Sequence, residues 1–178
     1  NTGSNNFISG FGDADNAQAL SLAKGETKNL TINGINYMVK NNSSNYSNAV
    51  LFSVNPVTGA ISFSGVNVNV TGQKDVSHNV ELYGLNFKFY SGEKDDIITM
   101  YAVNSTIYGE GGNDKLLINN VSTAYGGAGD DEIIINSSGT AYGDEGDDII
   151  TVNIANTGTI NGGLGNDTYN INAKVTNL

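Results

Sequence analysis

Five aspartates recur along the second half of the chain at spacings of 17 to 19 residues, and their chemistry is that of cation ligands. They are Asp96, Asp114, Asp131, Asp148 and Asp167. If each interval is one turn of a parallel β-structure, neighbouring carboxylates lie about 4.8 Å apart. A column of like charges at that spacing is repulsive unless cations lie between them. The spacing therefore predicts a row of cation sites along one edge of a stacked β-structure.

The residues that precede each aspartate narrow the type of cation. Each aspartate ends a six-residue, mostly glycine-rich segment: SGEKDD (91–96), GEGGND (109–114), GGAGDD (126–131), GDEGDD (143–148) and GGLGND (162–167). Carboxylates together with the carbonyls of a glycine-rich turn suit calcium, which takes six to eight oxygen ligands, better than magnesium. Zinc is disfavoured because the chain has no cysteine and one histidine. Simple hairpin turns without a metal are the alternative, but hairpins do not require carboxylates in register.

These segments resemble the glycine-rich nonapeptide G-G-x-G-x-D-x-U-x of the RTX (repeats-in-toxin) family. In that family the glycines form a tight turn and the aspartate binds calcium between stacked turns of a parallel β-roll. The third and fifth copies match every glycine, whereas Glu110 and Asp144 replace the second glycine of the second and fourth copies. Ser91 and Lys94 stand at glycine positions of the first copy. The resemblance covers a little under half of the chain.

The resemblance implies a set of calcium ligands and about three to four ions, because five turns leave four gaps. The implied ligands are Asp96, Gly109, Gly111, Asn113, Asp114, Gly126, Ala128, Asp130, Asp131, Gly143, Glu145, Asp147, Asp148, Gly162, Leu164, Asn166 and Asp167. The resemblance also implies a use for calcium. Such a chain crosses a type I secretion channel unfolded and folds in calcium-rich surroundings. Modules of this kind occur in adhesins, surface-layer proteins, toxins and secreted hydrolases.

The predicted fold is all-β, a right-handed parallel β-roll (β-solenoid) with its calcium turns on one edge. Each full turn, or rung, contains two short strands whose alternate residues face inward. One strand points inward at Ile98 and Met100, Leu116 and Ile118, Ile133 and Ile135, Ile150 and Val152, and Tyr169 and Ile171. The other points inward at Ile107, Ala124, Ala141 and Ile160. It also places Tyr90, Tyr108, Tyr125 and Tyr142 in an outward column, which either stabilises the stack or contacts a glycan or protein.

The turns at the opposite edge contain asparagine and serine and no carboxylates, for example Asn104-Ser105 and Asn136-Ser137-Ser138-Gly139. Calcium should therefore bind along one edge only, with asparagine side chains closing the backbone at the other.

The residues before the repeats divide into a cap and metal-free rungs. Residues 1–58 are predicted to form an N-terminal loop and β-hairpin cap, with Asn33-Gly34 as a hairpin turn. Asp13 and Asp15 lie in that loop, where a solvated turn is favoured over an ion site. Residues 59–90 are predicted to form metal-free rungs, in which His78 takes the aspartate position at a solvent-facing turn. Residues 91–178 then form the calcium-binding roll. The chain resembles a piece of a longer protein, with neighbouring domains as partners.

Composition limits the function further. The net charge of −10 is concentrated in residues 92–167, which hold 13 of the 18 acidic residues and two of the eight lysines. With no basic patch, nucleic acid is excluded as a partner, and no apolar run predicts membrane insertion. No catalytic motif is present, so we expect a structural module rather than an enzyme. The predicted location is extracellular or the bacterial cell surface. The alternatives are the roll of a secreted protease or lipase and a ligand-binding adhesin module.

Overall fold

The computed structural model describes residues 17–178, which form strands and no helix, so no helix in this part of the chain could span a membrane. Asp13 and Asp15 lie outside the described residues. Four strands come first: β1 (Gln18–Leu22), β2 (Thr27–Ile32), β3 (Ile35–Asn41) and β4 (Asn48–Val54). Two long strands follow, β5 (Ile61–Gly72) and β6 (Asn79–Tyr90).

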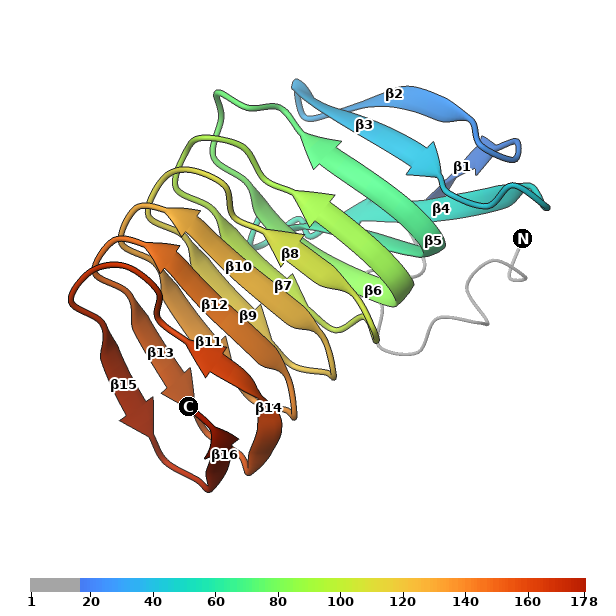
Figure 1. The fold of residues 1–178 in the computed structure, drawn as a ribbon. Helices are drawn as coiled ribbons and strands as arrows, with labels where there is room; N and C mark the ends of the chain where they lie inside the picture. The colour runs from blue at the N-terminus through green and yellow to red at the C-terminus, as the bar shows by residue number, and fades with distance from the viewer. Residues whose placement is uncertain (1–16) are drawn as a thin grey trace.

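Ten short strands then alternate between the two faces of a parallel β-solenoid of about six turns. One face contains β7 (Ile97–Met100), β9 (Lys115–Ile118), β11 (Glu132–Ile135), β13 (Ile149–Val152) and β15 (Thr168–Ile171). The other contains β8 (Thr106–Tyr108), β10 (Thr123–Ala128), β12 (Thr140–Glu145), β14 (Asn156–Asn161) and β16 (Val175–Asn177). The long strand β6 bends across both faces, pairing with β7 along its first half and with β8 along its second (Figure 1). The predicted all-β parallel solenoid is confirmed.

Strand pairing follows the predicted register. Val80 pairs with Ile98, and Ile98 in turn pairs with Leu116. The same steps of 17 to 19 residues continue through Ile133 and Ile150. The parallel stack also extends back to β5, where Ile61 pairs with Val80. The repeat interval is therefore the length of one solenoid turn.

Period-two alternation places the apolar residues inside. The predicted inward residues of β7 to β14 are at most 1% exposed, and they join one core with residues of the N-terminal strands. Tyr169 and Ile171 are the exceptions, with 38% and 39% of their surface exposed. Their register with Ile150 and Val152 is as predicted. They are exposed because no further rung covers β15 within the described part of the chain.

The first four strands extend the sheet from β5 in antiparallel pairs. Strands β3 and β4 pair with opposite halves of β5, while β2 and β1 form the outer strands. Strands β2 and β3 meet at Asn33 and Gly34, whose φ angles of 52° and 78° are those of a tight hairpin turn. Tyr37 and Val39 of β3 pack in the same core as the rung residues.

The prediction that His78 lies at a solvent-facing turn is wrong, because this side chain is 2% exposed. The hydroxyl group of Tyr37 lies 3.0 Å from Nδ1 of His78, and the carbonyl oxygen of Gln73 lies 2.8 Å from Nε2. Both ring nitrogens therefore have partners, and Tyr37 from β3 covers the imidazole. Its contacts give the histidine a structural role at the junction between β3 and the rungs.

Candidate metal centre

The in-register aspartates form a buried column along the glycine-rich edge of the solenoid. Asp96, Asp114, Asp131 and Asp148 are each at most 2% exposed, while Asp167 in the last rung is half-buried. The Oδ1 atom of each accepts a hydrogen bond from the backbone N–H at the same position of the preceding rung, over 2.7 to 2.9 Å. This ladder ends at the backbone N–H of His78. One oxygen of every carboxyl group thus holds two rungs together.

The second carboxyl oxygen has no such partner. The Oδ2 atoms of Asp96, Asp114, Asp131 and Asp148 are buried and accept no hydrogen bond. A buried charged oxygen without a donor costs several kcal/mol, roughly, unless a proton or a cation neutralises it. Four such atoms in one column therefore require protons or a bound cation to neutralise them.

The glycine at the first position of the last four turns explains how these oxygens fit. A Cβ atom added at Gly109 would lie 2.6 Å from Oδ2 of Asp114 and 2.5 Å from the carbonyl oxygen of Gly126. The same pair of oxygens flanks Gly126, with Asp131 Oδ2 at 2.5 Å and the Gly143 oxygen at 2.6 Å. Only glycine leaves room there for a carboxylate oxygen and a carbonyl oxygen from the next rung.

Glycines at the fourth position serve the approach of neighbouring rungs. The φ angles at this position lie between 89° and 124°, a range that residues other than glycine rarely adopt; the glycines are Gly112, Gly129, Gly146 and Gly165. Each also faces the backbone carbonyl of the residue at the fourth position of the preceding rung. Carbonyl groups thereby enter the gaps between rungs. The carbonyls of Gly112, Gly129 and Gly146 are candidate ligands that the sequence analysis missed.

A second polar ladder runs in the opposite direction at the fifth position of the turns. There the side-chain oxygen of one rung accepts a hydrogen bond from the backbone N–H of the following rung, over 2.7 to 2.9 Å. Its members are Asp95, Asn113, Asp130, Asp147 and Asn166. Asp95 was missed by the sequence analysis, although its register with Asn113 would have revealed it. Their bonding to the backbone gives these side chains a role in holding the turns, whether or not they contact an ion.

The second position adopts a left-handed backbone in all five turns. The replacements Glu110 and Asp144 have φ angles of 64° and 74°, close to those of Gly127 and Gly163. The Glu110 carboxylate accepts a hydrogen bond of 3.0 Å from the backbone N–H of Gly92. The backbone N–H of Gly127 lowers the pKa of Asp144 against the larger rise caused by burial. These contacts to the preceding rung compensate for the strain of a non-glycine residue at this position.

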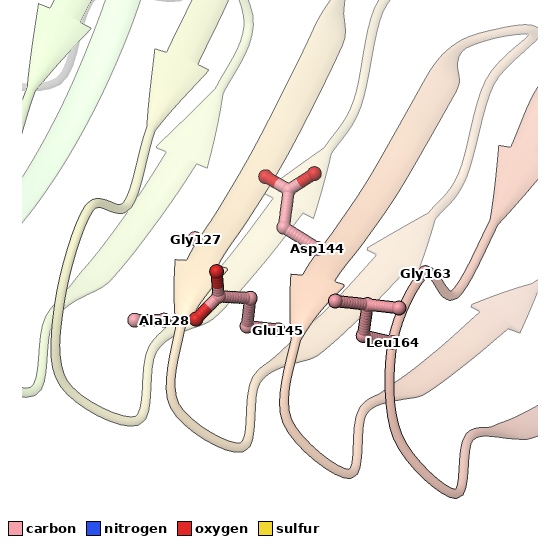
Figure 2. Close-up of a pocket in the computed structure, with 6 residues that line it drawn as sticks. All are labelled: Gly127, Ala128, Asp144, Glu145, Gly163 and Leu164. Atoms are coloured by element: carbon pink, nitrogen blue, oxygen red, sulfur yellow. The ribbon is translucent and has the colours of Figure 1, made fainter.

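The third-position residues line the outer rim of the edge. Figure 2 shows Ala128, Glu145 and Leu164 on neighbouring turns around a shallow hollow that Gly127, Asp144 and Gly163 also line. The carbonyl oxygens of Glu145 and Leu164 accept hydrogen bonds of 3.0 Å from Gly129 and Gly146. These two predicted ligands are therefore already engaged by the neighbouring backbone.

Burial has a strong effect on the protonation of the aspartate column. Desolvation raises the pKa of Asp114 to about 9, of Asp131 to about 7 and of Asp148 to about 6, and charges on neighbouring aspartates add to the rise. Hydrogen bonds from the backbone oppose it. The pKa of Asp96 is also raised by burial. Without a cation, these raised pKa values favour protonation of Asp114 and Asp131 near neutral pH.

The donor set suits a hard cation that binds oxygen. In the described residues, no three His, Cys, Asp or Glu side chains converge on one point. The three gaps after the second, third and fourth turns instead bring a carboxyl oxygen close to a glycine carbonyl of the next rung. Carboxylate and carbonyl oxygens are the ligands that calcium takes in flexible sites, with water completing its shell. The residues present thus fit calcium better than zinc.

The outward surfaces carry two other regular features. The rings of Tyr90, Tyr108, Tyr125 and Tyr142 are stacked, with centroids 4.6 to 5.2 Å apart and interplanar angles of at most 10°. At the opposite edge, Asn119, Asn136, Asn153 and Asn172 form a ladder of side-chain hydrogen bonds of 2.8 to 2.9 Å. Both columns bond each rung to the next without a metal.

The fold and this edge define a parallel β-solenoid with a buried carboxylate column. Comparison of the chain with models of protein families, with curated proteins and with solved structures gave no match.

Proposed function

We propose that this chain is a calcium-binding structural module whose repeat-containing half, residues 91–178, folds when calcium binds. The observation that carries the proposal is a set of buried Oδ2 atoms without hydrogen-bond donors. Three of them, those of Asp114, Asp131 and Asp148, also lie beside a first-position glycine that a carbonyl oxygen of the next rung approaches. The RTX-like turns, with the first- and fourth-position glycines that admit carbonyl oxygens, support the same ligand.

On this proposal the two halves of the chain depend on calcium to different degrees. Each site that binds only the folded state adds about 2.7 kcal/mol when free calcium is 100 times its dissociation constant. Three such sites add roughly 8 kcal/mol, which is comparable to the stability of a whole domain. The inward residues of the repeats include Ala124 and Ala141, whereas the earlier rungs bury Phe63, Phe87 and Phe89. The repeats therefore depend more on the cation.

A module that folds on calcium is suited to a protein that leaves a calcium-poor cytosol. We therefore propose an extracellular or cell-surface location, with adjoining domains of a larger protein as neighbours. On this proposal the chain has no catalytic role of its own.

Glycan binding by the tyrosine column is a weaker second proposal. Sugar rings stack on the faces of aromatic rings, but here each interior tyrosine ring has both faces covered by its neighbours. Only ring edges and hydroxyl groups remain for a partner. The stacking favours a role in stabilising the solenoid.

Far-UV circular dichroism with thermal melts tests the main proposal, in chelator and in millimolar calcium, with magnesium as the control. We expect calcium alone to increase the β signal and the melting temperature. A fold of the same stability in all three conditions would contradict the proposal.

A further inference from the structure

The first gap of the column, between the turn at residues 91–96 and the turn at 109–114, differs from the other three gaps. Its turn has Ser91 at the first position, where the later turns have glycine. Ser91 is fully buried, and its hydroxyl group donates a hydrogen bond of 2.8 Å to the carbonyl oxygen of Gly109. In the other gaps the equivalent carbonyls, those of Gly126, Gly143 and Gly162, lie beside an aspartate Oδ2.

The Ser91 hydroxyl group thus contacts the carbonyl that would otherwise face a cation. The Oδ2 atom of Asp96 is buried and unpartnered like those of the later turns, but the Gly109 carbonyl is already bonded to Ser91 and is not free to bind an ion.

The fourth position of the first turn is changed as well. Lys94 is not among the residues with positive φ, whereas the four glycines that follow it in the column all are. The carbonyl of Lys94 faces Gly112, just as the carbonyl of each later fourth-position glycine faces the glycine of the next rung. The first turn therefore directs a carbonyl toward the next rung but lacks the positive φ angle that the later turns have at this position.

We propose that Ser91 ends the ion column, so that three gaps bind calcium and the first gap is closed by a serine hydroxyl group. This inference rests on the proposed function and refines it. Together with His78, whose backbone N–H ends the Oδ1 ladder, Ser91 marks a boundary in the solenoid. The rungs before this boundary are stabilised by their apolar core and hydrogen bonds alone. They provide a folded template on which the calcium-dependent rungs stack.

Counting bound ions by native mass spectrometry, with calcium titrations against a chromophoric chelator, tests the inference. We expect three ions in the wild type, one for each gap in which a first-position glycine faces an aspartate Oδ2 and a carbonyl. Asp96→Asn should retain all of them. Ser91→Gly combined with Lys94→Gly should gain one ion, because it restores both glycines of the first turn. Ser91→Ala is the matched control, since it removes the hydroxyl group but leaves a methyl group in the gap and should gain none.

The outcomes separate this inference from the proposed function. A wild type that binds no calcium overturns the proposed function itself. A wild type with one ion more than expected, which loses that ion in Asp96→Asn, overturns only the role of Ser91. A glycine double variant that keeps its β signal in calcium and gains no ion also overturns that role. If the double variant does not fold, the comparison of the wild type with Asp96→Asn still decides.

Discussion

Replacing Asp131 by asparagine should have opposite effects on stability in the absence and in the presence of calcium. Asparagine keeps an oxygen that can accept the bond now made by Oδ1 to the backbone N–H of Asp114. Its amide nitrogen would stand near the position of Oδ2, which shares the space beside Gly126 with the carbonyl oxygen of Gly143. The amide can therefore donate a hydrogen bond where the carboxylate has none.

The magnitude in chelator follows from the protonation of Asp131. Burial raises its pKa to about 7, whereas an unfolded aspartate has a pKa of about 3.9. At pH 8 this carboxyl group is mostly ionised in both states, but burial makes its ionised form less stable in the folded state. At about 1.4 kcal/mol per pKa unit, the difference between the folded and unfolded pKa values limits this destabilisation to roughly 4 kcal/mol. Because the neighbouring aspartates titrate together, we expect Asp131→Asn to stabilise the chain by about 2 kcal/mol in chelator.

In millimolar calcium the same substitution should destabilise the chain. The Oδ1 atom of Asp131 bonds to the preceding rung, whereas Oδ2 lies beside Gly126 together with the Gly143 carbonyl of the following rung. The loss of its charge therefore weakens the site between its own rung and the following one. Loss of one site at calcium 100 times its dissociation constant costs about 2.7 kcal/mol.

Urea unfolding followed by circular dichroism at pH 8, with and without calcium, measures both effects. Asp75→Asn is the matched control, because Asp75 is exposed and lies outside the repeats. It makes the same change in charge and should alter stability little in either condition. If Asp131→Asn changes the free energy of unfolding in the same direction with and without calcium, the prediction is refuted.

Three further predictions concern the pH, the glycines and the tyrosine column. In chelator, the contribution of the aspartate column to stability should be highest below about pH 4. It should fall as the pH rises from there to about 9, because folding raises the pKa of Asp148 to about 6, of Asp131 to about 7 and of Asp114 to about 9. In saturating calcium the carboxyl groups are ionised in both the folded and the unfolded state over pH 6 to 9, so this pH dependence should disappear. Urea midpoints measured with and without calcium would show both behaviours. Gly146→Ala should lower the free energy of unfolding by about 2 kcal/mol, because its φ is 124° and the carbonyl of Gly129 occupies the space of a Cβ. Urea unfolding would measure the loss, and an unchanged urea midpoint would contradict the turn geometry. Tyr125→Ala should cost about 1 to 2 kcal/mol through the loss of two stacking contacts. Thermal melts would measure that loss, and an unchanged melting temperature would show that the column does not stabilise the stack.

The repeat made most of the solenoid predictable from the sequence. Identical turns at a constant interval fix which residues pair, and alternation then fixes which face inward. Leu116, Ile133 and Ile150 could therefore be assigned to the core, and Tyr108, Tyr125 and Tyr142 to an outward column, without coordinates.

The environment of individual polar groups was harder to predict, because it depends on residues distant in the sequence. His78 is buried by Tyr37, which lies 41 residues earlier on an antiparallel strand outside the repeat. The exposure of Tyr169 and Ile171 depends on the absence of a covering layer, which register does not reveal. The different bonding of Oδ1 and Oδ2 in the aspartates also depends on side-chain direction within a turn. Spacing predicts that the carboxylates form a column, but it does not specify which oxygen bonds to the backbone.

The hydrogen bond from each Oδ1 to the backbone of the preceding rung couples neighbouring rungs. Because Oδ1 of Asp148 bonds to the backbone of Asp131, any ligand that fixes the Asp148 carboxyl group through Oδ2 also fixes the rung before it. The same relation holds between Asp131 and Asp114. In a stacked structure, where each rung contacts mainly its neighbours, such a link makes the folding of one rung favour the next. The proposed calcium sites should therefore fill cooperatively even though no two of them share all their ligands. The fully buried Ser91, which bonds to Gly109 without an ion, supplies the end from which that order can spread.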